Sequence, residues 1–479
     1  MSTNVRPEPD ELLVELAEYA LAPHAFGAAT LATARLVLAD SLGCAALAST
    51  HAACARLLGP VVPGTVVPNG ARVPATTYEL DPVKAAFDTG ALIRWLDFND
   101  TWLAAEWGHP SDNLGAILAL GDHLARSGAV LRVRDVLDAA VVAHEIQGVL
   151  ALGNAFNRVG LDHVVLVKVA STAVAARLLG LDRDAVVAAL SNAWIDGHAL
   201  RTYRQAPNTG SRKSWAAADA TARGVFLALL AAAGEPGYPS ALSAPRWGFE
   251  HVLFDGRRVT LERPLGSYVM DNVLFKVAFP AEFHAQTAAE CAVALHPVVR
   301  HRVEDVAGIE IWTQEPALRI IDKSGPLHNP ADRDHSLQYV TVVALLHGEL
   351  TDRHYEDEVA ADPRIDRLRE RCVVHEEQRY SKDYLDPAKR SIANAVRVSF
   401  ADGSVTERVE VEYPLGHPRR RREALPLLRA KLRANLRAAY AGDRADALIE
   451  LLLDDPELQE LPADDLLGAV AAVDVRTRA

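Results

Sequence analysis

The sequence predicts a mainly α protein: a large all-helical domain built from both chain ends, plus a smaller inserted α+β lid domain. The 479 residues are too many for one hydrophobic core, which indicates two or three domains. Roughly the first 250 residues are rich in Ala, Leu and Val at helical spacing, whereas strand-like alternation begins near residue 268. We therefore expect a helical domain of residues 1–267, with residues 418–479 packing back onto it, and a lid of residues 268–417.

The first half of the chain contains the clearest helical patterns. Apolar residues recur at helical spacing in five stretches, residues 29–50, 112–128, 133–152, 171–180 and 214–237. Small residues lie on several faces of these stretches, which is typical of helices that pack on more than one side in a bundle. The last stretch ends at Gly and Pro, which stop a helix.

The second half mixes strand and helix patterns. "EDVAGIEIWTQ" (304–314) alternates like a strand, and "ANAVRVSFADGSVTERVEVEYP" (393–414) reads as two strands around an Asp-Gly turn. A helical pattern lies between them at 335–348, and helical patterns return after Pro418. Two short crossings would then join the domains, and the boundary between domains is a common place for a binding cleft.

Charge and composition exclude several classes of protein. The formal net charge of −13 disfavours a nucleic-acid or anionic-membrane surface, and we interpret the four arginines at 419–422 as a solvated turn or dimer contact. The apolar runs look shorter than a membrane span, so we expect no membrane partner. The acidic N-terminal stretch lacks the pattern of a signal peptide, which favours the cytoplasm.

The four cysteines show no spacing typical of a metal centre. Cys44, Cys54, Cys291 and Cys372 form no CxxC pair and match no iron–sulfur or structural zinc pattern. A disulfide framework is uncommon in a cytoplasmic chain of this size. We expect most of these cysteines to be buried as small apolar side chains.

The stretch "LDFNDTWLAAEWGHPSDN" (96–113) combines acids, histidine and tryptophan at one helix junction. Its polar groups are Asp97, Asp100, Glu106, His109 and Asp112. Asp97 and Thr101 would share a face if the preceding helix continued, and the His109-Pro110 step would break it. Asp112 could cap the next helix. Capping plus a satisfied core histidine explains each residue singly; for the whole cluster we favour a ligand pocket.

Three further stretches carry candidate groups. His163 follows a glycine-containing turn, where a lone histidine is more often structural. Four cations lie before the helix at 214–237: Arg201, Arg204, Arg212 and Lys213. Positive charge at a helix start favours the binding of an anion, although a solvated basic loop is the simpler alternative. Only eight of the 50 basic residues are lysine, and Lys276 stands within an apolar run, where a charge needs a partner or a function.

Five stretches together resemble the MmgE/PrpD family. They are "DFNDTW…GHPSDN", "RQAPNTGSRKSWAAADATARG", "GSYVMDNVLFKVAFPAEFHAQTA", "ALRIIDKSGPLHNPADRDHSLQYV" and "YSKDYLDPAKRSIANAVRVSFADGS". The resemblance implies a homodimer with a pocket between a helical domain and an α+β lid. By analogy with a decarboxylase of this family, it maps the pocket onto Asp97, Thr101, His109, His163, Lys213, Lys276 and Tyr339. Glu282 and His284 could each fill the place of one further family histidine.

The implied activity is dehydration of a small tricarboxylate, 2-methylcitrate, to 2-methyl-cis-aconitate in the methylcitrate cycle of propionate degradation. A metal-free acid/base elimination would use His109 and His163 as base and acid in either order. Asp97 would orient a neighbour or act as base, and Lys276 would stabilise the developing charge. The expected substrate-binding residues are Thr101, Lys213, Arg212, Tyr339 and His284, and no metal or other cofactor is expected.

Two alternative functions remain at this level. Decarboxylation or epimerisation of a related polycarboxylate begins with a similar carbanion-like centre, so one pocket could support it. A non-catalytic metabolite-binding protein would need the His/Lys cluster to be structural. A metal-dependent hydrolase is disfavoured because the sequence has no HxH or HExxH spacing.

Overall fold

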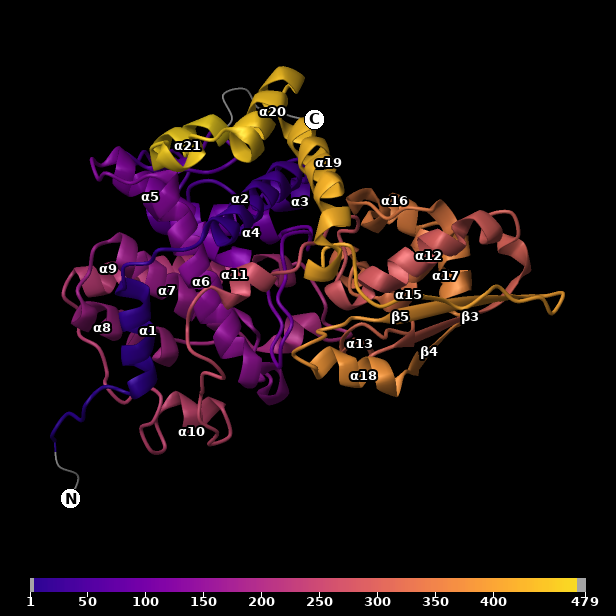
Figure 1. Cartoon of the computed structure of the whole chain (residues 1–479), viewed down its shortest axis with the longest axis horizontal. Helices are drawn as coiled ribbons and strands as arrows, with labels where there is room; N and C mark the ends of the chain where they lie inside the picture. The colour runs from indigo at the N-terminus through magenta and orange to yellow at the C-terminus, as the bar shows by residue number, and fades with distance from the viewer. Residues whose placement is uncertain (1–3, 472–479) are drawn as a thin grey trace.

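The computed structural model describes residues 4–471 and confirms a mainly α fold, with 57% helix and 8% strand. Helices from both chain ends gather in one half, and the segment between them forms the other half (Figure 1). The outer ends of the predicted helical domain, residues 1–3 and 472–479, lie outside the described residues. The exact domain limits stay a prediction.

The helical half contains the first eleven helices and the last three. These are α1 (Glu11–Leu21), α2 (Ala28–Ser49), α3 (Ala52–Ala55), α4 (Pro82–Arg94), α5 (Leu114–Arg126), α6 (Val133–Gly153), α7 (Val164–Leu178), α8 (Arg183–Ile195), α9 (Arg212–Ala232), α10 (Phe249–Leu253), α11 (Tyr268–Asn272), α19 (Arg421–Ala439), α20 (Gly442–Ile449) and α21 (Ala463–Val470). All five predicted N-terminal helices are present, and α7 begins earlier than its apolar pattern predicted.

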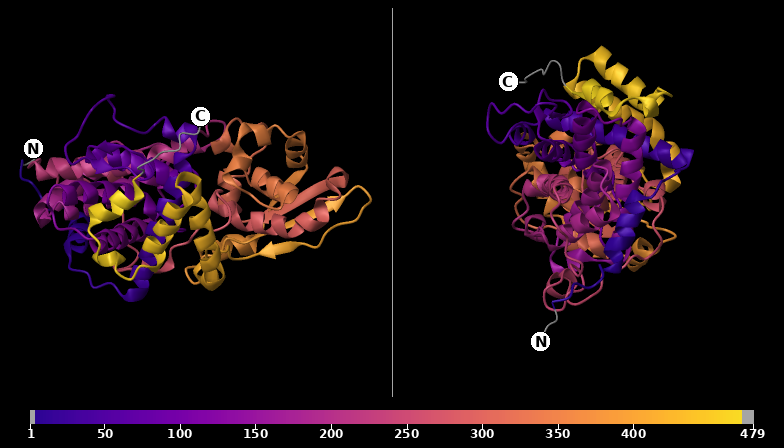
Figure 2. Two further views of the ribbon diagram at one scale, coloured as in Figure 1. Left: turned by 90° about the horizontal axis from the view of Figure 1, so that it is seen from above. Right: turned by 90° about the vertical axis from the view of Figure 1, so that its left-hand side faces the viewer.

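The C-terminal helices pack back onto the N-terminal ones, as the sequence predicts. α19 packs against α2 and α21 against α5, and Figure 2 shows them lying over the first helices of the chain. One hydrophobic cluster includes side chains from both ends, for example Leu42 and Leu432. Burial of this shared apolar surface explains why two distant segments form one unit.

The helical half is not entirely helical. β1 (Ala71–Arg72) and β2 (Glu79–Leu80) form a two-stranded antiparallel ribbon beside α5. The expectation of an all-helical domain is therefore corrected in this detail. Strands of two residues are too short to give an alternating pattern, which is why the sequence did not indicate them.

The other half is built on one four-stranded sheet. Its strands are β3 (Val306–Thr313), β4 (Cys372–Glu376), β5 (Asn394–Phe400) and β6 (Val409–Val411), in the order β4-β3-β5-β6. β3 pairs with β4 in parallel and with β5 antiparallel. The predicted hairpin is present as β5 and β6, and Gly403 in its turn has φ +84°.

Helices complete this half. They are α12 (Gln286–Val299), α13 (Glu315–Ile320), α14 (Pro330–Arg333), α15 (Leu337–His347), α16 (Asp357–Ala360), α17 (Pro363–Arg369) and α18 (Gln378–Leu385). α12 packs on β5 and β6, and α15 packs on α12. The predicted helix at 335–348 is thus confirmed. A second hydrophobic cluster fills the space between these helices and the sheet.

The two crossings between the halves lie against each other. The amide of Phe275 donates to the carbonyl of Gly416 at 3.2 Å. A Cβ on Gly416 would lie 1.6 Å from the carbonyl oxygen of Phe275, so only glycine permits this approach. Before the first crossing, α11 still packs on α6 and α2 of the helical half.

Three helices correct the expectation that no apolar run is long enough to span a membrane. α2, α6 and α9 reach that length and hydropathy by composition alone. Within the protein, 72%, 83% and 61% of their most apolar windows is buried. Their apolar character is therefore used for packing against other helices.

Candidate active site

The stretch 96–113 forms an irregular buried loop. α4 ends at Arg94, and Asp97 adopts φ +51°, so the expectation that Asp97 and Thr101 share a helix face is wrong. Thr101 instead pairs its backbone with Leu274 of the first crossing, through bonds of 2.8 and 3.0 Å. These bonds satisfy the backbone that a continued helix would have satisfied.

Asp97 lies at the centre of a buried charge cluster. The Lys276 ammonium donates to the Asp97 carbonyl at 2.7 Å and also contacts its carboxylate, while Arg94 Nη1 lies 2.9 Å from Asp97 Oδ1. Burial by itself would raise the pKa of Asp97, but the charges of Arg94 and Lys276 hold it well below its usual value. Burial also lowers the pKa of Lys276. The geometry suits Asp97 as a fixed carboxylate that orients cations.

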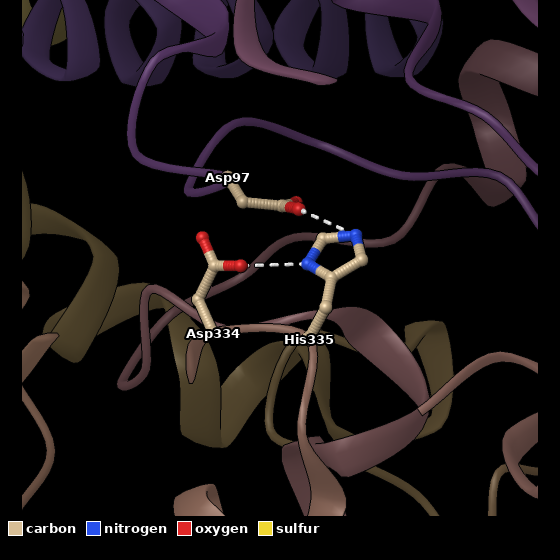
Figure 3. Close-up of side chains that lie close together, drawn as sticks. All are labelled: Asp97, Asp334 and His335. Atoms are coloured by element: carbon tan, nitrogen blue, oxygen red, sulfur yellow. Dashed lines mark hydrogen bonds and ion pairs between the residues drawn. The ribbon is translucent and has the colours of Figure 1, made fainter. Parts of the chain in front are cut away.

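The cluster extends across the boundary between the halves. Asp97 comes from the helical half, whereas Asp334 and His335 approach it from the lid (Figure 3). His335 Nδ1 donates to Asp334 at 2.7 Å, and its Nε2 lies 3.8 Å from Asp97. Burial lowers the pKa of His335 to about 4. Neither Asp334 nor His335 was among the site residues predicted from the sequence.

These three side chains have the spacing of a metal-ligand set. One ligand atom from each lies within 4.8 Å of the others. However, the Lys213 ammonium is 2.6 Å from Asp334 and 3.5 Å from Asp97. A divalent cation at this point would face that fixed positive charge, so the residues present fit an ammonium rather than a metal ion.

His109 and His163 face each other with ring centroids 5.9 Å apart. His109 Nδ1 lies 2.6 Å from the carbonyl oxygen of Asp100. Because a carbonyl only accepts, a neutral His109 carries its proton on Nδ1 and leaves the Nε2 lone pair free. That Nε2 lies 3.7 Å from Asp97. Burial lowers the pKa of His109 well below its usual value, which keeps the ring a proton acceptor.

His163 is buried without hydrogen bonds. Its exposed fraction is 2%, and neither ring nitrogen has a hydrogen-bond partner among the described residues. The carboxylate of Asp162 lies 3.1 Å from Nδ1, but Asp162 is engaged by Arg204 at 2.5 Å. Burial lowers the pKa of His163 well below its usual value. An unpartnered buried imidazole is uncommon in a core and favours a functional role.

Glu282 and His284 form one unit rather than two alternatives. The Glu282 carboxylate accepts from the His284 amide at 2.8 Å and from its Nδ1 at 2.7 Å. The ring's Nε2 lies 3.2 Å from the hydroxyl of Tyr384. Burial would raise the pKa of Glu282, but His284 lowers it to about 2.

Arg201 provides a cation that is not fully used by the protein. Its Nη1 lies 3.8 Å from Asp162 and 3.9 Å from Glu106, beyond hydrogen-bond distance. Among the described residues this Nη1 donates no hydrogen bond. Arg201 is 5% exposed and stacks 4.9 Å from the centre of the Trp107 ring. Such a group is suited to binding an anion.

A small cavity joins these side chains between the halves. Its lining is Arg94, Asp97, Thr101, Leu103, Trp107, His109, His163, Arg201, Arg204, Glu282, Phe283, His284, Ile320 and His335. Its volume of about 20 Å³ leaves room for one water molecule. A larger cavity of about 540 Å³ lies beside Asp334, also lined from both halves. The structure therefore shows the inner site in a closed form.

Comparison with known proteins identifies the family of this chain. The MmgE/PrpD N-terminal domain matches residues 14–262, and the MmgE/PrpD C-terminal domain matches residues 279–455. The chain belongs to the MmgE/PrpD family. The resemblance inferred from its sequence is thereby confirmed.

Several MmgE/PrpD proteins are similar over nearly their whole length. A 2-methylcitrate dehydratase of Cupriavidus necator is 56% identical, with 97% of this chain and 98% of that protein covered. A 2-methylcitrate dehydratase of Salmonella typhimurium is 55% identical with the same coverage. A mitochondrial 2-methylcitrate dehydratase of Yarrowia lipolytica is 53% identical, with 94% and 88% covered.

Four expected site residues of this MmgE/PrpD chain are absent from the cavity lining: Lys213 and Lys276 contact Asp97 behind it, whereas Arg212 and Tyr339 lie apart from both. Arg212 is on the outer side of α9, where its side chain is 40% exposed and stacks 4.3 Å from the Trp215 ring. Tyr339 is buried, but its hydroxyl donates to the carbonyl of His354 at 2.6 Å. Their places depend on which way α9 and α15 turn their faces relative to the cavity, and the sequence pattern does not predict this.

The remaining predictions for the site differ in outcome. The structure brings together Asp97, Thr101, His109, His163, Lys213, Lys276 and His284. Asp112 does not cap α5, so that expectation is wrong; it accepts from Asn99 instead. Arg94 was missed, although its place in the last turn of a helix just before Asp97 could have indicated it.

Proposed function

We propose that this chain dehydrates 2-methylcitrate to 2-methyl-cis-aconitate, as a hydro-lyase of the methylcitrate cycle of propionate degradation. The observation that carries this proposal is the 56% identity to a protein named 2-methylcitrate dehydratase across 97% of the chain. The buried pair of imidazoles supports it, because elimination of water needs one group to take a proton and one to give a proton.

His109 is the proposed base. In this step the C–H bond next to a carboxylate breaks, its proton moves to Nε2, and its electron pair forms the new double bond. The free lone pair on Nε2 lets His109 accept this proton, and its lowered pKa keeps the ring unprotonated near neutral pH until the reaction. Asp97, 3.7 Å away, stabilises the resulting imidazolium.

His163 is the proposed acid. The C–O bond breaks as the leaving oxygen takes a proton from the ring, and water forms. Burial lowers the pKa of His163 in the closed site, and an arriving trianion raises it again by its negative charge. Thr101 is the proposed hydroxyl that positions the substrate.

Substrate carboxylates are proposed to bind the cations around the cavity. Arg201 replaces Arg212 in this role, because its Nη1 is buried and lacks a hydrogen bond among the described residues. Lys276, Lys213 and Arg94 supply further positive charge, with Lys276 stabilising the carboxylate next to the new carbanion. His284 forms part of the cavity wall. Tyr339, whose hydroxyl donates to the His354 carbonyl, would bind substrate only if that bond broke as the halves open.

Substrate binding is proposed to require opening of the halves. A cavity of about 20 Å³ cannot hold a tricarboxylate, whereas the neighbouring 540 Å³ cavity leads from the surface to Asp334. The Phe275–Gly416 pair of crossings is the proposed hinge. His51 of the helical half and Asp352 of the lid, 3.0 Å apart, would separate as the site opens.

The test is ultraviolet absorbance of the conjugated product, measured with chelator-treated protein and 2-methylcitrate. We expect product without added metal and loss of turnover in the single variants H109Q and H163N. Unchanged turnover in both variants would contradict the assigned roles. Carbon dioxide release from cis-aconitate, with no product from 2-methylcitrate, would favour a decarboxylase, and binding without conversion would favour a metabolite-binding protein.

The remaining proposals concern partners and location. A homodimer is supported by exposed apolar side chains on α8, the loop after it and α9: Ile195, Leu200, Phe226 and Leu230. Light scattering would show a mass of about 52 kDa instead if the protein were a monomer.

The four free thiols fit the reducing cytoplasm. The net charge of −13 and the buried apolar helices support the absence of nucleic-acid and membrane partners.

A further inference from the structure

One buried lysine outside the cavity holds two segments of the site. Lys431 of α19 donates from its ammonium to the carbonyl oxygens of Phe98 and Lys276, at 2.7 Å each. The same ammonium lies 2.8 Å from Asp40 on α2 and 3.7 Å from the centre of the Phe98 ring. Lys431 is only 7% exposed. It does not line the cavity.

The two carbonyl groups belong to the segments that carry the central ion pair. Phe98 directly follows Asp97, whose backbone is in the left-handed region. Lys276 is the partner of Asp97 and lies on the first crossing. One ammonium therefore fixes the loop after α4 and the crossing at the same point, without lining the cavity itself.

We infer that Lys431 is a positioning residue for the proposed reaction: by binding both carbonyls, it sets the distance between the Asp97 carboxylate and the Lys276 ammonium. The inference rests on the proposed function, because it concerns the same site. An apolar side chain of similar length would fill the space but leave two buried carbonyls without a donor. A small shift of Asp97 or Lys276 would then misplace the groups that face the substrate.

The surroundings of Lys431 explain how its charge is tolerated. Asp40 is the nearest carboxylate. Burial raises its pKa and the charge of Lys431 offsets part of that rise, so that the pKa of Asp40 is about 6. Asp100 and the Cys44 thiol are the other titratable groups that contribute at this place. The pair with Asp40 stabilises the ammonium in the core, and the two carbonyls give it a fixed direction.

Lys84 offers a matched control. Like Lys431, it pairs with a buried aspartate, here Asp88. Its ammonium donates to the backbone carbonyl of Leu57 at 3.1 Å and lies 5.0 Å from the centre of the Phe87 ring. It stands at the start of α4, ten residues before Arg94, which is about 15 Å along the helix. Loss of the Lys84 pair therefore tests what a broken buried pair does by itself.

The experiment compares D40N, the double variants D40N/K431M and D40N/K431R, and the control D88N/K84M, all as full chains. D40N keeps both carbonyl bonds, so we expect kcat on 2-methylcitrate within about threefold of wild type. D40N/K431M removes the bonds without leaving a buried lone carboxylate, and we expect kcat to fall by about 10–100-fold with KM changed less. D40N/K431R restores the donors and should recover most of kcat.

A pH profile gives a readout that lost stability would not change. Lys276 is faced by Asp97, Arg94 and Glu282, and of these Asp97 is the main group that keeps it charged. His163, as the acid, and Lys276, as a cation, must both be protonated, so the alkaline side of the kcat/KM profile falls in two steps. If the Asp97–Lys276 distance grows in D40N/K431M, the pKa of Lys276 falls further and the step of the alkaline limb that belongs to Lys276 moves to lower pH. D88N/K84M should lose a similar amount of thermal stability while keeping the limb and kcat.

The outcomes separate the inference from the proposed function. No product with the wild-type chain would overturn the proposed function itself. Turnover by wild type, with D40N/K431M no slower than D88N/K84M and an unmoved alkaline limb, would overturn the role of Lys431. If D40N/K431M does not fold, an unshifted limb and full kcat in D40N/K431L, which also lacks a donor for the two carbonyls, would overturn it equally.

Discussion

Two polar clusters contact the same 96–113 loop and are both buried, but they differ in how their groups are bonded. Around Asp100, one carboxylate oxygen accepts from Ser111 at 2.7 and 3.1 Å, and the other lies 2.9 Å from His144 Nε2. The other nitrogen of His144 lies 2.7 Å from the carbonyl of Ala140. Around the cavity, by contrast, His163 and Arg201 Nη1 form no hydrogen bond among the described residues.

The difference distinguishes structure from function better than burial or residue type does. A saturated cluster stabilises the fold because every polar group has a partner. An unsaturated cluster costs stability and persists where a ligand supplies the missing partners. We therefore infer that the Asp100 cluster supports the loop, whereas the cavity cluster binds the substrate.

Replacement of one histidine in each cluster should give the largest contrast. H109Q is expected to lower kcat on 2-methylcitrate by about 10³-fold with little change in melting temperature, since it removes the base. H144Q is expected to cost about 1–3 kcal/mol of unfolding free energy, since it removes the imidazole partner of the second carboxylate oxygen of Asp100. Steady-state kinetics and thermal unfolding of both variants measure this. Equal kinetic defects would break the comparison.

Two arginines near the start of α9 should separate binding from surface charge. R201Q removes the buried Nη1 and is expected to raise KM by about 10–100-fold, the value of one charge-assisted hydrogen bond. R212Q, whose side chain is 40% exposed, should leave KM within about twofold. The measurement is KM for 2-methylcitrate at fixed ionic strength. A larger effect of R212Q would return the substrate role to Arg212.

Substitution of Gly108 by alanine should test the position of His163 without removing a polar group. A Cβ on Gly108 would lie 3.0 Å from His163 Cδ2 and 3.2 Å from Gln147 Nε2. G108A should therefore rotate His163 and lower kcat by about tenfold, with KM nearly unchanged. G121A, where the nearest atom is 3.8 Å away, is the matched control. Equal kcat in the two variants would show that His163 has room to adjust.

The smallest expected effect is the position of the acid limb of the pH profile. A base works when neutral, and burial lowers the pKa of His109 well below its usual 6.5. The acid limb of kcat/KM should therefore lie well below pH 6.5, since it reports the free enzyme. A limb at 6.5 or above would indicate an exposed or differently assigned base.

Much of the fold could be predicted from the sequence because its patterns are local. The five N-terminal helices, the β5–β6 hairpin and helix α15 follow from apolar spacing and turn residues. The parallel pair of β3 and β4 could not be predicted, since nearly 60 residues, including several helices, separate the two strands in sequence and only the tertiary packing brings them together. The β1–β2 ribbon was too short to give a pattern.

Part of the candidate site could also be predicted, where a residue is unusual for its surroundings. Lys276 within an apolar run and His109 before a proline are examples: His109 lines the cavity, and Lys276 pairs with Asp97, which also lines it. Arg212 and Tyr339 show the limit, since a helix pattern gives spacing but not the direction of one face relative to another domain. The family resemblance predicted Tyr339 as a site residue, but it could not predict that the Tyr339 hydroxyl donates to the carbonyl of His354.

The sequence by itself determined the helical and α+β halves, the family and the identity of most polar groups at the site. Local periodicity and residue chemistry carry that information. Only the tertiary structure decided which polar groups are saturated and which are free, because hydrogen-bond partners such as Asp100 and His144, or Lys431 and the carbonyl of Lys276, come from distant segments. Whether a buried imidazole supports the fold or faces a substrate depends on those distant partners.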